Sequence, residues 1–429
     1  MSAQQAAGVQ AHLSDTTCQT TTALDGSVRW ARIAVTAVFV VHGLLFASWT
    51  AHIPHVKAHV SLTDGTLGLA LLGAPAGSVA AILASSWLLT RLGSRRIVQA
   101  ALVGYCAAGP LVGLTGSLPM LFTALFVWGA FQGALDVAMN TQAIALERTR
   151  PRVLMSGLHG SWSIGSFAGA GIGALAVAAG IGLSTQLLGL GAIALLGTGL
   201  LTARLLPATA ERPDQRESLV GHPDVDQHPS ESTSRWSSGM VPLGATAFAA
   251  MLCEGATADW AAVYLSGPLH TSGLVPGLGY AVFSFAMMTV RLSGNRLLTR
   301  FRPDQLLPTL AAIATVGFAA ALLIAQPTAA LVGFGCLGVG LASVVPAVFS
   351  AAGRIPGLHP GTAVATASAC GWAGFVCGPS LIGRLSAWTS LPVALGLLPL
   401  LTASIVVGTR TSRALCDRQL AHDHHNAAA

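Results

Sequence analysis

Long apolar runs alternate with short polar or arginine-containing stretches along most of the chain. Each run is about 20 residues long, which is the length that a helix needs to cross the hydrocarbon core of a membrane. Twelve such runs follow one another, at residues 31–51, 66–89, 97–117, 119–146, 153–179, 184–205, 239–265, 275–299, 305–325, 328–351, 361–386 and 391–409. The pattern predicts an all-α, polytopic membrane protein with twelve transmembrane helices.

A polar stretch divides these spans into two sets of six. Residues 207–238 are rich in Pro, Ser, His and acidic residues, a composition that cannot bury a core and is typical of a linker. The expected organisation is a tail (1–30), a six-helix half (31–206), the linker (207–238), a second six-helix half (239–409) and a second tail (410–429).

The two halves repeat at one constant offset of 209 residues. The tetrapeptide Leu-Leu-Thr-Arg closes the second span at 88–91 and the eighth span at 297–300. Gly165 and Gly169 of the fifth span correspond to Gly374 and Gly378 of the eleventh. Several matches at one offset, joining equivalent spans, predict two homologous halves in parallel orientation.

Composition and charge agree with a membrane protein and exclude several other classes. Only 9% of the 429 residues are charged, against about 25% in soluble domains. The net charge of +6 does not indicate nucleic-acid binding, because the Arg residues lie at the ends of apolar spans. The seven Cys contain no C-x-x-C pair, and His422, His424 and His425 form only a weak metal-binding pattern in the expected tail, so we expect no metal and no cofactor.

The Lys and Arg residues predict the orientation in the membrane. Arginine clusters follow the second, fourth, sixth, eighth and twelfth spans and Arg354 follows the tenth, whereas the loops on the other side carry only Lys57 and, near a span end, Arg384. By the positive-inside rule, the linker and both tails are cytoplasmic. The polar first 30 residues do not resemble a cleavable signal peptide, so the first span itself is expected to direct insertion.

Ionisable side chains inside spans are costly unless they face a polar interior, so each is a candidate functional residue. They are His42, Asp136, His159, Glu254, Asp259 and Arg291. The third, sixth, ninth and twelfth spans contain none. One helix in every three is therefore expected to face lipid, while the others surround a polar space.

Two spans carry the acidic residues. In the fourth span, Gln132, Asp136 and Asn140 are spaced by four and form one polar stripe, which suits either substrate contact or hydrogen bonding between helices. Burial favours the neutral form of a carboxyl group, as a proton carrier requires. In the seventh span, Glu254 and Asp259 are five apart and are expected to point to different sides of the helix.

These patterns predict a transport site. The expected proton-coupling residues are Asp136, Glu254, Asp259 and His159. The expected substrate-binding residues are His42, Trp49, Gln132, Asn140, Trp162, Trp260, Tyr280, Arg291 and Trp372. Each has a structural alternative: interfacial anchoring for the Trp residues, a hydrogen-bonded core position for His159, an outer gate for Asp259 and snorkelling for Arg291. No P-loop, catalytic triad or metal spacing occurs, so an enzyme is not expected.

The two-half organisation and the Gly/Arg turns after spans two and eight resemble the major facilitator superfamily. The resemblance implies a cytoplasmic gate formed by Arg91, Gly93, Arg95, Arg96, Gly294 and Arg296. Thr90 and Asn295 stand where this family usually has acidic residues. In this family spans 1, 4, 7 and 10 line a central cavity.

Five segments resemble a more specific branch, the fucose-permease-like bacterial inner-membrane proteins. They are SWTAHIPHVK (48–57), GALDVAMNTQA (133–143), SGLHGSWSIGSFAGA (156–170), EGATADWAAVYL (254–265) and GWAGFVCGPSLIG (371–383). His52 replaces an expected Arg, which makes an outer polar contact weaker or pH-dependent. The resemblance implies a monomer in the bacterial inner membrane.

Two transport functions follow. The first is proton-coupled symport of a small polar solute such as a sugar, and the second is export of a drug or metabolite by proton antiport. The sequence Gly165-x-x-x-Gly169-Ala170-x-x-Gly173 partly resembles an antiporter motif, although its Gly-Pro pair occurs instead at 378–379. A scaffold without transport activity would have no reason to retain buried carboxylates.

Overall fold

A computed structural model describes residues 3–149, 154–208, 239–293, 303–355, 358 and 360–411. Within these ranges every regular element is a helix and no strand occurs. Most of the expected linker, and the predicted gate residues Gly294 and Arg296, lie outside the described residues.

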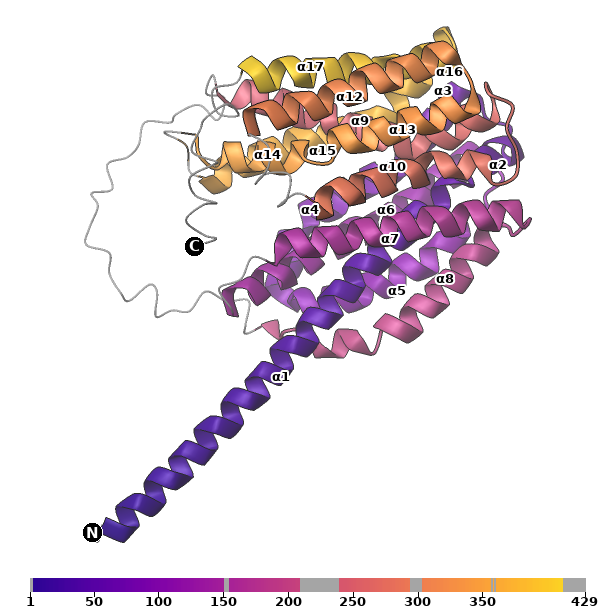
Figure 1. Ribbon diagram of the computed structural model, residues 1–429. Coiled ribbons are helices and arrows are strands. Elements are labelled where there is room, and N and C mark those ends of the chain that lie inside the picture. The colour runs from indigo at the N-terminus through magenta and orange to yellow at the C-terminus, as the bar shows by residue number, and fades with distance from the viewer. Residues whose placement is uncertain are drawn as a thin grey trace.

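Every predicted span coincides with one helix or with two consecutive helices (Figure 1). The first half contains α1 (Ala3–Thr50), α2 (Ile53–His59), α3 (Asp64–Leu71), α4 (Gly73–Leu92), α5 (Ser94–Val112), α6 (Leu118–Thr149), α7 (Met155–Ala178), α8 (Leu183–Thr198) and the 3-10 helix η1 (Leu201–Arg204). The second half contains α9 (Met240–Ser266), α10 (Val275–Leu292), α12 (Pro303–Ile324), α13 (Pro327–Leu341), α14 (Val344–Ala352), α15 (Pro360–Trp388), α16 (Leu391–Leu395) and α17 (Leu397–Thr411). The second, sixth, tenth and twelfth spans are interrupted, since each is built from a consecutive pair; in the sixth the pair is α8 and η1.

Ten of the described segments are long and apolar enough to cross a membrane. The remaining two predicted spans are α5, of 19 residues, and α15, of 29 residues. Arg95 and Arg96 lower the mean hydropathy of α5, and Gly and Ser lower that of α15. Both helices are long enough to span the bilayer, so together with the other ten they make twelve transmembrane spans.

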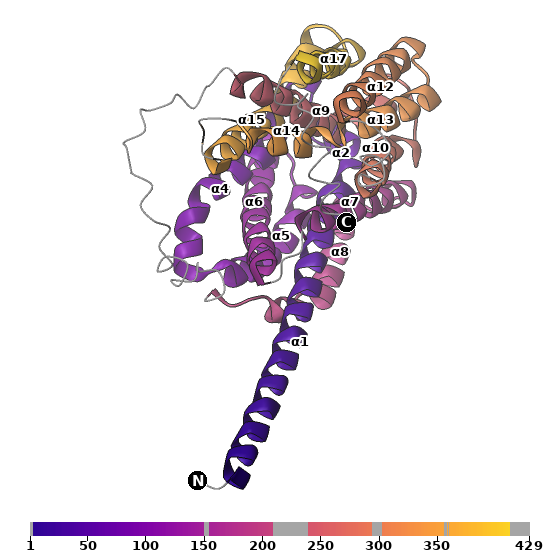
Figure 2. The same cartoon turned by 60° about the vertical axis from the view of Figure 1, so that its left-hand side comes forward.

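The packing of the helices confirms the repeat. In the first half α1 packs on α7, α4 on α6, and α5 on α6 and α8. In the second half the equivalent helices form the same pairs: α9 with α15, α10 with α13, and α12 with α13 and α17. Figures 1 and 2 show the two groups of helices side by side. They meet mainly through α7 with α10 and α3 with α15.

Small residues allow two of these pairs to approach very closely. A Cβ atom on Gly165 would lie 2.1 Å from the carbonyl oxygen of Val40 in α1, and one on Gly374 would lie 2.2 Å from that of Phe248 in α9. Contact at this distance requires glycine. The repeat therefore preserves a backbone contact as well as sequence identity.

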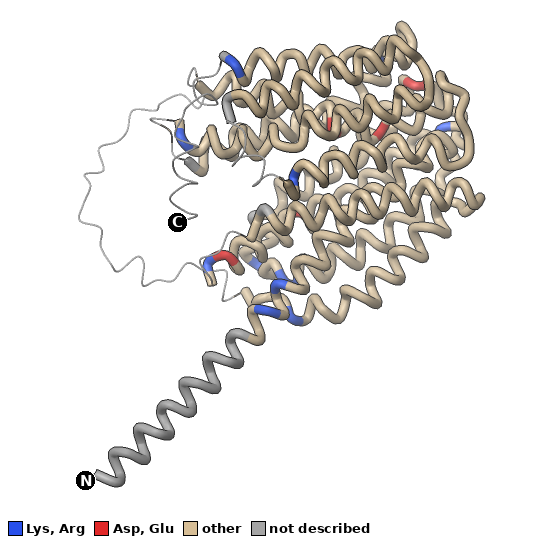
Figure 3. Tube along the Cα trace, in the orientation of Figure 1, with Lys and Arg blue, Asp and Glu red and all other residues tan. Residues whose placement is uncertain are grey.

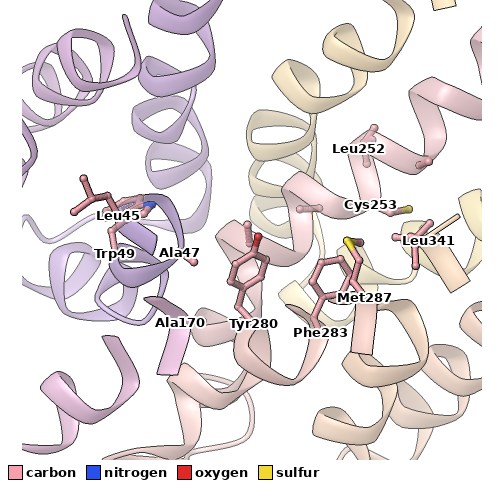
Figure 4. Close-up of a cluster of buried hydrophobic side chains, with 14 of the residues drawn as sticks. Leu45, Ala47, Trp49, Ala170, Leu252, Cys253, Tyr280, Phe283, Met287 and Leu341 are labelled. Atoms are coloured by element: carbon pink, nitrogen blue, oxygen red, sulfur yellow. The ribbon is translucent and has the colours of Figure 1, made fainter. Parts of the chain in front are cut away.

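Apolar side chains fill part of the space between the halves. Figure 4 shows Tyr280 between Ala47 and Trp49 of the first half and Phe283 and Met287 of the second. All five are buried.

The basic residues gather at one end of the bundle, from which α1 extends (Figure 3). We call this the arginine-rich end; among the described residues it includes Arg91, Arg95, Arg96, Arg148, Arg204, Arg354 and Arg410. Lys57 belongs to α2, which lies at the opposite end (Figure 1). The distribution follows the pattern that predicted the orientation.

His52 lies at the opposite end, outside the spans, at the start of α2. Its Nε2 is 2.7 Å from Oε1 of Gln186 in α8, and the amide nitrogen of Gln186 donates to the carbonyl of Ser48 at 3.0 Å. Burial lowers the pKa of His52 and neighbouring His55 lowers it further, whereas the hydrogen bond that Nε2 donates to Gln186 raises it. The folded structure therefore favours the neutral form of the His52 imidazole.

The lowered pKa of His52 predicts a pH-dependent stability. The unfolded chain takes up the proton first as the pH falls below about 6.5, so the free energy of unfolding is expected to decrease from there downward. Thermal unfolding of the purified protein should show a falling midpoint between about pH 7.5 and 5.5. His52→Gln should have a smaller fall than the wild type, and an unchanged fall would contradict this role for His52.

Candidate functional site

A cavity of about 410 Å³ lies between the two halves. Its walls come from α1, α3, α4, α6 and α7 on one side and from α9, α10, α14 and α15 on the other. The structure brings eleven of the thirteen predicted site residues to it: His42, Trp49, Gln132, Asp136, Asn140, His159, Trp162, Glu254, Asp259, Arg291 and Trp372. Helices α5, α8, α12 and α17 contribute no lining residue, in agreement with their lack of ionisable residues in the spans.

The polar stripe of α6 faces the cavity as the four-residue spacing predicts. The side-chain amide of Asn140 donates to the backbone carbonyl of Asp136 at 2.8 Å and to its carboxylate at 3.3 Å. Both partners lie on one helix, so these contacts do not join helices. Asp136 keeps an oxygen free to meet a proton or a ligand, because Asn140 bonds Oδ1.

His42 is held by aromatic neighbours. The indole N–H of Trp162 in α7 donates to Nδ1 of His42 at 2.8 Å. The imidazole stacks on Tyr105, which stacks in turn on Trp128, with ring centres 5.8 and 5.1 Å apart. A neutral His that accepts at Nδ1 carries its proton on Nε2. Its ring is fixed, and so is the face that it presents to the cavity.

Arg291 reaches from α10 across to the first half. Its Nη1 donates to the hydroxyl of Ser163 in α7 at 3.2 Å, and its Nε donates to the carbonyl of Ala342 at 3.2 Å. Both acceptors are neutral. The guanidinium therefore lines the cavity and does not snorkel toward the membrane surface.

Glu254 and Asp259 both line the cavity, although their spacing predicts different sides of α9. Five residues turn a helix by about 140°, so the cavity faces a wide arc of this helix. The two side chains do point to different sides of α9, as the spacing predicts, and both still reach the cavity.

Trp260 and Tyr280, both predicted to bind substrate, do not line the cavity. Trp260 is fully buried and packs against Gly383 of α15, since it follows Asp259 and points about 100° away from it. Tyr280 is buried against Phe283 and meets the edge of Phe46. Both pack between helices, and the structure does not bring these two predicted residues to the cavity.

Several lining residues were not predicted, and helical spacing would have found some of them. Trp128 extends the stripe of Gln132, Asp136 and Asn140 by one turn, and Phe46 lies between His42 and Trp49 at the same spacing. Ser368 precedes Trp372 by four residues. Phe349 and Val345 of α14 carry no polar signal, so only the fold places them there.

The predicted gate residues Arg91, Gly93, Arg95 and Arg96 surround a separate hollow of about 960 Å³ at the arginine-rich end. Gly93 has a φ of 73°, which favours glycine at this turn. The guanidinium of Arg91 lies 4.5 Å from the ring centre of Trp87. None of these arginines forms an ion pair with another described residue.

At the opposite end a polar contact joins the halves. Asp64, at the start of α3, pairs with Lys57 through one carboxylate oxygen and accepts a hydrogen bond from Ser386 of α15 through the other. Beside it, a Cβ atom on Gly68 would lie 2.6 Å from the carbonyl of Pro379. Farther toward the arginine-rich end, α4 and α15 make only sparse contacts. We call Lys57, Asp64 and Ser386 the outer latch.

Comparison with known proteins places the chain among transporters. A sequence model of the Major Facilitator Superfamily matches residues 34–379. An uncharacterised MFS-type transporter of Yersinia pestis is 33% identical over 88% of this chain and 95% of its own length. The membrane protein MosC of Rhizobium meliloti is 30% identical over 85% of this chain and 86% of its own length.

Solved structures share the fold. The nucleoside transporter NupG matches with a TM-score of 0.67 at 12% identity, over 89% of this chain and 100% of that one. A bacterial homologue of the human lysosomal transporter Spinster matches with a TM-score of 0.60 at 17% identity, over 92% of this chain and 95% of that one. At these identities the likeness concerns the arrangement of helices alone.

Proposed function

The chain belongs to the major facilitator superfamily and is a multi-pass membrane transporter, not an enzyme, and we propose that it is a proton-coupled symporter of a small polar solute such as a sugar. The two halves would rock about the cavity and open it to each side in turn. The proposed setting is the bacterial inner membrane, with both termini and the arginine-rich end in the cytoplasm.

One observation carries the proposal of proton coupling: three carboxylates from two helices line the cavity, and none forms an ion pair with a described residue. A carboxylate that is better hydrated in one conformation than in the other shifts the balance between them when it binds a proton. Asp136 and Glu254 lie in opposite halves, so each is suited to respond to the rocking movement.

Binding of solute in the same cavity would make the two events depend on each other. Trp49, Trp162 and Trp372 offer flat faces for a ring, and Gln132 and Asn140 offer amide groups for hydroxyls. The resemblance of five segments to fucose-permease-like proteins also favours a sugar-like solute. This composition supports a polar substrate more than a large apolar drug.

The test is proton movement in reconstituted vesicles. Adding a transported sugar outside should acidify the lumen if solute and proton travel together. Luminal alkalinisation by the same solute would favour the antiport alternative. Transport with no pH change would contradict proton coupling of either sign.

The outer latch predicts that the cavity is closed at the end opposite the arginine-rich end. Asp64→Ala removes the hydrogen bond from Ser386 that joins the halves, worth about 1.5–3 kcal/mol because one group is charged, and should favour opening at the opposite end. A cysteine placed at Gln132 in a cysteine-free background should then react with an impermeant thiol reagent added outside about tenfold faster.

The matched control is His59→Gln, which changes an exposed side chain of α2 outside the latch. Its labelling rate should equal that of the parent. An unchanged rate in Asp64→Ala would show that the latch does not hold this end closed.

A further inference from the structure

The charges lining the cavity are unequal. Asp136 of α6 and Glu254 and Asp259 of α9 face it together with one guanidinium, that of Arg291. The one ion pair among described residues, Lys57 with Asp64, is elsewhere. Arg291 donates to the neutral oxygens of Ser163 and Ala342, so it forms no ion pair with any of the three acids.

A single coupled proton removes only part of this excess. If one carboxylate carries the coupled proton and Arg291 balances a second, one negative charge is still unpaired. An unpaired charge in a low-dielectric space costs several kcal/mol. A positively charged solute would supply the missing partner, whereas a neutral solute would leave the cost in place and an anion would increase it.

The walls of the cavity suit the same chemistry. Aromatic rings come from both halves: Phe46 and Trp162 on one side, and Trp372 and Phe375, 5.7 Å apart in an edge-to-face pair, on the other. The faces of such rings attract cations, by about 0.5–2 kcal/mol for each contact. Acidic groups among aromatic faces form a cage for an ammonium group.

We propose that the solute is a small organic cation, a protonated amine carried on a polar ring or chain. The inference rests on the proposed function, because it takes the cavity as the transport site. It narrows that function from polar solutes in general to those that carry an amine. Gln132 and Asn140 then serve the hydroxyl groups of the same molecule.

The probe is a set of three compounds of nearly equal size that differ in charge: benzylammonium, benzyl alcohol and benzoate. Binding to the full-length protein in lipid nanodiscs is followed at about pH 7.5 by tryptophan fluorescence, since three Trp of the predicted site line the cavity. Benzylammonium is expected to bind at least about tenfold more tightly than either of the others.

Variants of the cavity acids test whether these residues cause the preference for the cation. Glu254→Gln or Asp259→Asn should reduce it to about threefold or less, because each removes one negative charge at unchanged size. Glu147→Gln is the control: Glu147 lies outside the cavity and accepts hydrogen bonds from the backbone of Leu154 and Met155, which Gln can also do. This variant should keep the wild-type preference.

Equal binding of the three probes, tighter binding of benzyl alcohol or benzoate, or no binding of benzylammonium to the wild-type protein would overturn the proposal. A cation preference that persists in both acid variants would overturn it too. The binding assay uses no gradient, so it is independent of coupling. Proton movement driven by a neutral sugar, without cation binding, would support the proposed function and contradict this inference. Cation binding without any proton movement would support this inference and contradict proton coupling.

Discussion

The Asp136→Asn variant is expected to lose uphill accumulation of solute completely, so that the internal concentration only reaches equilibrium with the outside. Asn keeps the size of the side chain and the contact with Asn140, but it cannot exchange a proton. The balance between the two conformations then no longer responds to the proton gradient. Vesicles with an imposed pH gradient, compared with vesicles without one, measure this loss as the accumulation ratio.

Glu254→Gln provides the parallel experiment in the other half. Because Asp136 is expected to carry the coupled proton, Glu254→Gln should retain part of the accumulation that Asp136→Asn loses. Glu147→Gln, at the arginine-rich end, should accumulate solute as the wild type does. Wild-type accumulation in both Asp136→Asn and Glu254→Gln would exclude these residues as the coupling groups.

The second large effect concerns assembly of the first half. Gly169→Leu should prevent α1 and α7 from packing, because even a Cβ atom at this position would lie 2.1 Å from the carbonyl oxygen of Leu44. Overpacking a well-fitted core costs about 1–3 kcal/mol, and a backbone neighbour cannot move aside as a side chain can. We expect little monodisperse protein after detergent extraction, measured by fluorescence-detected size-exclusion chromatography.

Gly171→Leu is the matched control, two residues away on the same helix. A Cβ atom there meets nothing within 4 Å. This variant should elute as the wild type does and unfold at a similar temperature. A normal profile for Gly169→Leu would mean that α1 and α7 tolerate separation.

Much of the site followed from the sequence because ionisable residues are so costly in a membrane. Apolar spans have few places for Asp136, Glu254 or Arg291 except a shared polar interior. The four-residue spacing also predicted that Gln132 and Asn140, the neighbours of Asp136 on α6, belong to the site. Aromatic residues gave a weaker signal: Trp49 and Trp372 line the cavity, whereas Trp260 is packed inside the bundle.

The sequence by itself determined the number of spans, the two-half repeat and the helices that carry charge, because all three depend on hydropathy and spacing along one chain. Only the tertiary structure decided that Glu254 and Asp259 share a cavity, that Tyr280 leaves it, and that Asp64 meets Ser386. These relations depend on how far one half is rotated against the other. That angle is set by close contacts between distant segments, such as Gly68 against Pro379, which no local pattern encodes.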